Sequence, residues 1–150
     1  MDPGPIDDLP IEPYYPDPWV QSVHTLIREM DQSVEIVIVE GKRDQAGLEA
    51  AGYTGSIIQC SNTAGIVPFA HQLDEEPIAI LTDYDPAGRE LNGKLRELIP
   101  ARKVDAYWRR ELGLLLTQRG RYEIEALNNI FGSSTLGPVN RSSGDRREAD

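Results

Sequence analysis

The chain has 150 residues, with 25 Asp and Glu against 15 Lys and Arg, and a formal net charge of −10 at pH 7. This length suits one domain with a real hydrophobic core and is too short for two sizeable ones. The negative balance argues against a broad cationic groove that grips nucleic acid by phosphate contacts alone, but not against a local basic patch or a metal-mediated contact. It also fits a halophilic surface, where salt screens self-repulsion.

The cysteine content and the hydropathy of the chain indicate its cellular compartment. Cys60 is the single cysteine, so we expect no internal disulfide and a reducing environment. No apolar run approaches the ~18 residues of a membrane span. The first residues also lack the basic and then apolar pattern of a signal peptide. These features predict a cytoplasmic protein without a membrane partner.

The two ends of the chain differ in composition from its body. Residues 1–16 contain five prolines and several acids, so we expect a disordered or extended lead-in. Residues 132–150 are rich in Ser, Gly and charge, which predicts a disordered tail. The predicted domain therefore covers residues 17–131.

Within the body, short β-branched or apolar runs alternate with helical patterns. An amphipathic helix is predicted from Pro18 to about Asp31, with Asp17 as its N-cap. This alternation predicts an α/β domain of about four mainly parallel strands, flanked by helices. The strands are expected at 34–39, 56–60, 78–81 and 104–108, a turn at 61–65, and the further helices at 43–51, 66–73, 86–99, 111–117 and 121–131.

Acidic side chains follow two of these strands directly: Glu40 comes after the first, and Asp83 and Asp85 after the third. Because the carboxyl ends of parallel strands meet at one edge of a sheet, the three carboxylates converge if the strands are neighbours. Buried carboxylates are costly unless a cation neutralises them. Mg²⁺ prefers such oxygen ligands. The alternative role for each acid is helix capping, which applies above all to Asp85 and to the nearby Asp44.

Basic and polar side chains accompany the acids. Lys42 follows Glu40 closely, and Arg89 lies one turn after Asp85, where it can hold a phosphate. Asn62, after the second strand, can also contact a phosphate, although an Asx-turn or a helix cap is the more usual role. The pair Arg109-Arg110 either adds a cationic rim at the same edge or is simply solvated.

Two segments together resemble the Toprim domain, which is shared by topoisomerases, DnaG-type primases, maturase-type ribonucleases and OLD-type nucleases. The resemblance covers roughly residues 34–109, and the whole chain looks most like the small, stand-alone archaeal Toprim proteins. Either segment alone would be a weak signal. The segments are Ile38-Val39-Glu40-Gly41-Lys42 and, about forty residues later, Leu81-Thr82-Asp83-Tyr84-Asp85-Pro86-Ala87-Gly88-Arg89.

This resemblance implies a Rossmann-like Toprim fold and Mg²⁺-dependent chemistry on the phosphodiesters of RNA or DNA. It makes Glu40 a metal ligand and the candidate catalytic acid or base. It also makes Asp83 and Asp85 ligands of two Mg²⁺ ions, for which Mn²⁺ can substitute. Lys42 resembles the basic residue of the nuclease and maturase branches. The chain departs from the larger enzymes, because it lacks the topoisomerase region with a nucleophilic tyrosine and the zinc module of bacterial primases.

The leading functional expectation is therefore a nuclease, and the alternative is a non-catalytic, metal-loaded module that binds nucleic acid or a replication or repair partner. An Asp-x-Asp phosphatase of the haloacid-dehalogenase type is disfavoured by Pro86-Ala87 and the short remaining chain. A receiver domain is disfavoured because its first strand would end in an acidic pair, where this chain has Glu40 alone. A P-loop NTPase is excluded, since no Gly-x-x-x-x-Gly-Lys-Ser/Thr occurs.

Overall fold

Three parallel strands form the sheet around which the chain is arranged. The structure is a computed structural model that describes residues 14–60 and 77–132. The strand order is β2-β1-β3. The central strand pairs Val37 with Ile57 of β2 and with Ala79 of β3. The bounds are β1 Ile36–Val39, β2 Ser56–Gln59 and β3 Ile78–Ile80.

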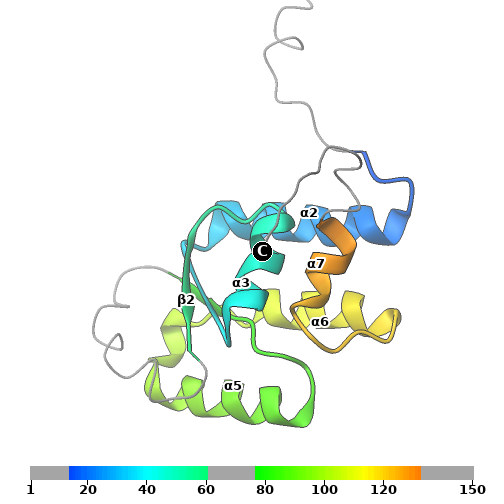
Figure 1. The fold of residues 1–150 in the computed structure, drawn as a ribbon. Coiled ribbons are helices and arrows are strands. Elements are labelled where there is room, and N and C mark those ends of the chain that lie inside the picture. Colours follow the sequence, from blue (N-terminus) through cyan, green and yellow to red (C-terminus); the bar gives the residue numbers. More distant parts are fainter. Residues whose placement is uncertain (1–13, 61–76, 133–150) are drawn as a thin grey trace, which may run out of the picture.

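Among the described residues, α3 follows β1 and α5 follows β3, and helices cover both faces of the sheet (Figure 1). The α/β class with a parallel sheet is therefore confirmed, as expected for strands joined by helical crossovers. The N-terminal helix begins as predicted, because the Asp17 side chain accepts a hydrogen bond from the Trp19 N–H at 2.9 Å. The bounds are α2 Pro18–Ser33, α3 Lys42–Ala50, α5 Pro86–Leu98, the short 3-10 turn η2 Ala101–Lys103, α6 Tyr107–Gln118 and α7 Ala126–Phe131.

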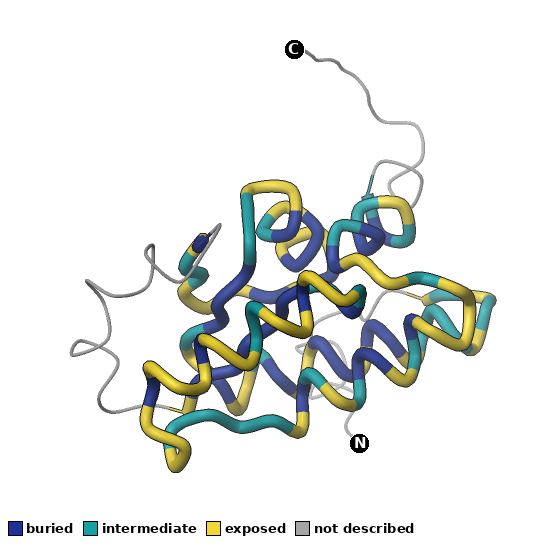
Figure 2. Tube along the Cα trace, turned by 90° about the horizontal axis from the view of Figure 1, so that it is seen from below, coloured by how far each residue is buried: buried dark blue, intermediate teal, exposed yellow. Residues whose placement is uncertain are grey.

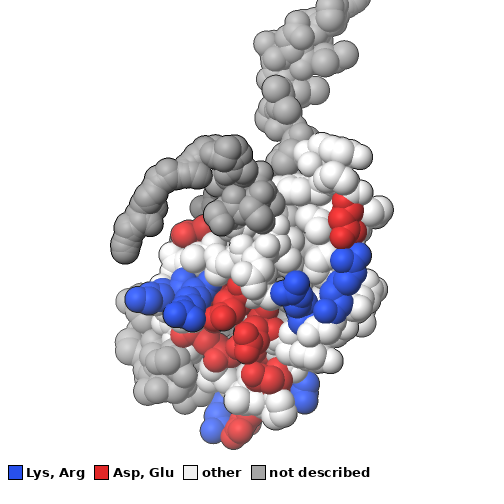
Figure 3. Space-filling model, turned by 45° about the vertical axis from the view of Figure 1, so that its right-hand side comes forward, with Lys and Arg blue, Asp and Glu red and all other residues white. Residues whose placement is uncertain are grey.

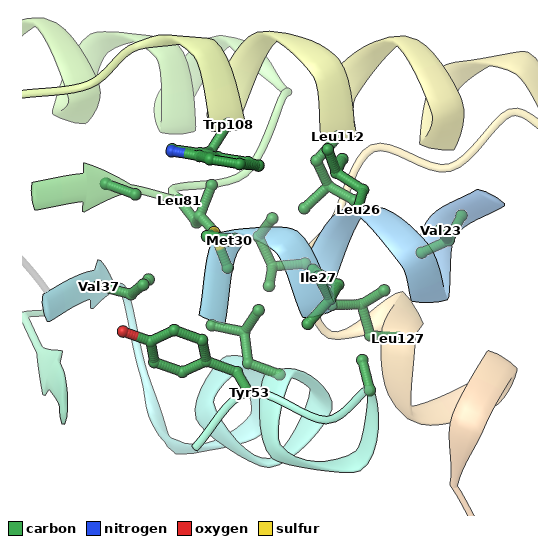
Figure 4. Close-up of a cluster of buried hydrophobic side chains, with 14 of the residues drawn as sticks. Val23, Leu26, Ile27, Met30, Val37, Tyr53, Leu81, Trp108, Leu112 and Leu127 are labelled. Atoms are coloured by element: carbon green, nitrogen blue, oxygen red, sulfur yellow. The ribbon is translucent and has the colours of Figure 1, made fainter. Parts of the chain in front are cut away.

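Alternate side chains of the strands enter two separate cores, as the two-residue period of a strand requires. Val37 and Val39 pack with α2, α6 and α7 in the larger core (Figure 4). Ile38 packs instead with Leu95 of α5 in the smaller core. Cys60 is buried in this second core. Figure 2 shows the buried residues on the inward sides of the helices and along the strands.

Two predicted elements differ in the structure. The expected strand at 104–108 is reduced to one isolated bridge between Ile78 and Val104. The last two residues of this expected strand, Tyr107 and Trp108, instead begin α6. The Asp105 carboxylate accepts hydrogen bonds from the Tyr107 N–H and the Trp108 indole, both at 3.1 Å.

The expected helix at 121–131 begins only at Ala126. The segment before it is bound to the loop after β3. The Tyr122 carbonyl accepts from the Tyr84 N–H at 2.7 Å, and the Ile124 N–H donates to the Asp83 carboxylate at 2.8 Å. The turn and helix predicted within 61–73, with Asn62, lie outside the described residues, and so do residues 1–13 and 133–150.

Gly88 lets α5 begin directly against the loop after β3. A Cβ atom at this position would overlap the Asp83 carbonyl. The Gly88 carbonyl also accepts a hydrogen bond from the buried Thr82 hydroxyl at 2.6 Å. The close approach of helix and loop therefore depends on the missing side chain.

We expect Gly88→Ala to lower the free energy of unfolding by about 1–3 kcal/mol, because the new methyl group forces the loop and the helix apart. Urea titration followed by circular dichroism measures this. Gly93→Ala is the matched control in the same helix, since a Cβ atom there meets nothing within 4 Å. It should raise stability by about 0.5–1 kcal/mol through helix propensity. Equal effects of the two substitutions would contradict the account.

Candidate functional site

The ends of β1 and β3 bring Glu40 and Asp83 together at one edge of the sheet. A carboxylate oxygen of Glu40, Oε2, accepts a hydrogen bond from the Asp83 N–H at 3.0 Å. The pairing of the strands continues up to this point, because the Leu81 N–H donates to the Ile38 carbonyl at 2.8 Å. The expectation that the two strands are neighbours is thus confirmed.

Two aspartates of the loop after β3 accept backbone hydrogen bonds. Asp85 is the N-cap of α5, and its Oδ1 accepts from the Gly88 N–H at 2.7 Å. The capping role expected for Asp85 is confirmed. Asp83 Oδ1 accepts from the Ile124 N–H at 2.8 Å. Both side chains are partly buried, so the loop presents them at the surface in defined positions.

Asp44 joins these acids from α3. Its carboxylate accepts a hydrogen bond from the Gly41 N–H at 3.2 Å, which closes the first turn of the helix. Asp44 is therefore a capping residue, but it is also buried. We call Glu40, Asp44, Asp83 and Asp85 the acidic cluster. In Figure 3 acidic side chains gather in the middle of one face, with basic side chains on either side of them.

The acidic cluster is electrostatically unfavourable as it stands. Burial, together with the charges of Asp44, Glu40 and Asp85, raises the pKa of Asp83 to about 6, although the hydrogen bond from the Ile124 N–H lowers it. Burial also raises the pKa of Asp44, with Glu40 and Glu125 adding to it. Carboxylates repel one another in a partly desolvated site, and a cation among them would offset part of this unfavourable free energy.

Arg109 of α6 fixes the loop between the cluster and the helices. Its guanidinium donates to the Thr82 carbonyl and, at 3.0 Å, to the Asp83 carbonyl. It also lies over the Tyr84 ring, 4.5 Å from the centroid. Arg89 adds a bond to the Tyr84 carbonyl. These guanidinium contacts go to backbone carbonyls and so hold the loop in shape.

Of the predicted phosphate-binding residues, Lys42 is the first residue of α3 and is exposed, as is Arg89 in the first turn of α5. Asn62 lies outside the described residues. The sequence did not single out Arg109 as the residue that holds the loop. The only signal available was its place in an arginine pair after the last predicted strand.

The donor set of the acidic cluster fits a hard divalent cation, but its present arrangement does not yet form a coordination shell. In the part of the chain that the structure describes, no group of three or more His, Cys, Asp and Glu side chains is placed to hold a metal ion. Glu40 Oε2, Asp83 Oδ1 and Asp85 Oδ1 each accept a backbone hydrogen bond. A carboxylate has two oxygens and about four lone-pair sites, so rotation of these side chains would supply the ligands.

Comparison with known proteins places the chain among archaeal relatives. The UPF0292 protein of Pyrococcus horikoshii is 39% identical over 99 residues, which are 63% of this chain and 70% of that protein. The UPF0292 protein of Pyrococcus abyssi is 35% identical over 109 residues, 70% of this chain and 78% of that protein. The chain belongs to the UPF0292 family.

Other members of UPF0292 match over a longer stretch. That of Pyrococcus furiosus is 29% identical over 123 residues, 81% of this chain and 92% of that protein. No family model matches the chain. A solved structure of a protein from Aquifex aeolicus is 26% identical, covers 75% of this UPF0292 chain and 98% of its own, and has a TM-score of 0.49. None of the helices within residues 14–60 and 77–132 is long and apolar enough to cross a membrane.

The raised pKa of Asp83 predicts a pH-dependent stability. Its ordinary pKa is 3.8 and its pKa in the folded chain is about 6, so the folded state holds this proton more tightly than the unfolded state does. Ionisation of Asp83 therefore lowers stability as the pH rises from about 4 to about 6, and the loss persists above pH 6.

In a chelating buffer, we expect Asp83→Asn to raise the free energy of unfolding at pH 7.5 by roughly 1 kcal/mol, an amount reduced for the solvent that screens a partly exposed group. Asparagine keeps an oxygen for the Ile124 N–H and carries no charge. At pH 4 the same substitution should have little effect. Urea titrations at the two pH values measure both, and an equal gain at pH 4 and pH 7.5 would refute the electrostatic explanation.

Proposed function

We propose that this UPF0292 protein is a Toprim-type, Mg²⁺-dependent protein that hydrolyses phosphodiesters of RNA or DNA at the acidic cluster. The observation that carries the proposal is the hydrogen bond between Glu40 and the Asp83 N–H, which joins the two Toprim-like segments at one sheet edge. The pKa of Asp83, raised to about 6, supports the proposal, because a bound cation would stabilise the ionised carboxylates that the fold disfavours.

In this proposal each residue has a separate task. Glu40, Asp83 and Asp85 would hold two Mg²⁺ ions, which Mn²⁺ can replace. When bound, the ions would supply charge neutralisation at the phosphodiester and a water of lowered pKa. Glu40 takes or returns a proton at its carboxylate, and Lys42 and Arg89 bind phosphate oxygens from the adjoining helix starts.

The second candidate is a metal-loaded module that binds nucleic acid or a protein of replication or repair without catalysis. One observation favours it: Asp85 and Asp44 already serve as helix caps, so part of the cluster has a structural role. Both candidate functions place the protein in the cytoplasm. This location is inferred from the single cysteine and stays a prediction.

We expect Glu40→Gln and Asp83→Asn each to reduce Mg²⁺-dependent cleavage of labelled RNA and DNA oligonucleotides by at least ~100-fold, because each removes a charged ligand. Calorimetric titration should show weaker Mg²⁺ binding for both. Glu35→Gln is the matched control, since Glu35 is exposed just before β1, away from the edge that carries Glu40.

The two candidate functions predict different results for the wild-type protein in these assays. Metal binding without cleavage of any oligonucleotide favours the non-catalytic module. Full cleavage by Glu40→Gln, or loss of cleavage in Glu35→Gln as well, would rule out the proposed catalytic site.

A further inference from the structure

A cleft lies beside the acidic cluster, between α5 and α6. Its volume is about 590 Å³, which is within the range of ligand clefts. Tyr84 and Tyr122 line it from the loops next to the cluster, and both helices supply its walls. We call it the arginine cleft, after four of the side chains that line it: Arg89, Arg96, Arg109 and Arg110.

The charge of the arginine cleft is opposite to that of the chain. Four of the 15 Lys and Arg residues line it, in a protein with a net charge of −10. The described residues that line the cleft include no Asp or Glu. Such a local reversal concentrates anions at one place on an otherwise repulsive surface, which favours an anionic ligand that binds along the cleft.

The four arginine side chains form two pairs, which differ in how far the protein holds them in place. Arg89 and Arg109 are held by backbone carbonyls of the loop that carries Asp83. Arg96, in the last turn of α5, and Arg110 are exposed. The Arg110 side chain lies 3.6 Å from the Glu111 carboxylate in a solvated pair. Such surface pairs contribute little, so Arg110 exchanges this partner for a phosphate at small cost.

An exposed aromatic ring marks the end of the cleft near the acids. Tyr122 has 51% of its surface exposed. Its carbonyl accepts a hydrogen bond from the Tyr84 N–H at 2.7 Å, so its backbone is held next to the loop of the cluster, and its side chain lines the cleft. Cationic grooves with an aromatic platform bind single strands by backbone contacts and base stacking. Duplexes are instead read by elements that protrude into their grooves.

We propose that the arginine cleft binds the phosphodiester backbone of a single nucleic-acid strand and leads it to the acidic cluster, with Tyr122 stacking on a base. The inference deepens the proposed function by naming a single strand as the substrate form. Its binding step needs no metal, so it can be tested separately from cleavage.

The test is fluorescence anisotropy with labelled oligo-U and oligo-dT, and with a duplex of equal length, in buffer with EDTA. Arg96→Gln/Arg110→Gln should weaken single-strand binding at least tenfold and make the slope of log K against log salt shallower by about 1.4, as two lost contacts require. The matched control is Lys94→Gln/Arg102→Gln, which removes two exposed charges that do not line the cleft. It should bind within about twofold of wild type.

Tyr122→Ala supplies an independent readout. It should weaken single-strand binding at least fivefold and leave the salt slope unchanged, because stacking releases no counterions. Unchanged binding by the double arginine variant, an equal loss in the control pair, or tighter binding of the duplex would each overturn the proposal. If the cleft variants lose single-strand binding but keep Mg²⁺-dependent cleavage, only the proposed role of the cleft is overturned. Intact binding without cleavage by the wild type overturns only the nuclease reaction.

Discussion

Repulsion among carboxylates at one sheet edge is the constraint on which the site depends. The parallel pairing of β1 with β3 places Glu40 against the Asp83 backbone, and α3 adds the buried Asp44. A fold selected for stability alone would not gather these charges in a partly desolvated position. The raised pKa of Asp83 reflects this cost, which comes first from burial and then from the neighbouring charges, and it supports our proposal that the cluster binds a cation.

The loop after β3 keeps the acids in place because several elements are bonded to it. Arg109 of α6 binds two of its carbonyls, the Ile124 N–H binds the Asp83 side chain, and Gly88 lets α5 begin against it. The same contacts shape the end of the arginine cleft. The acidic cluster and the arginine cleft therefore share one support, which is the arrangement that the proposed function requires.

Much of this could be predicted from the sequence, since the β-branched run before Glu40 and the apolar run before Asp83 define neighbouring parallel strands. One of the two failed predictions depends on local side-chain hydrogen bonds, and the other depends on a contact distant in the chain. The expected strand at 104–108 gives way to hydrogen bonds from Tyr107 and Trp108 to the Asp105 carboxylate, and the expected helix at 121–131 loses its first turn to bonds with the loop after β3. The sequence offered Arg89 and the pair Arg109-Arg110 as possible cationic residues at this edge, but not the cleft itself, because its lining residues are spread over two helices without a local pattern.

The most direct test is a ¹³C NMR titration of the Asp83 carboxyl with and without Mg²⁺. In chelating buffer the carboxyl should titrate near pH 6. Saturating Mg²⁺ should lower this midpoint by at least about one pH unit, because a bound cation favours the ionised form. A midpoint near 4 in chelating buffer, or one that Mg²⁺ leaves unmoved, would contradict the claim that the acidic cluster is a cation site.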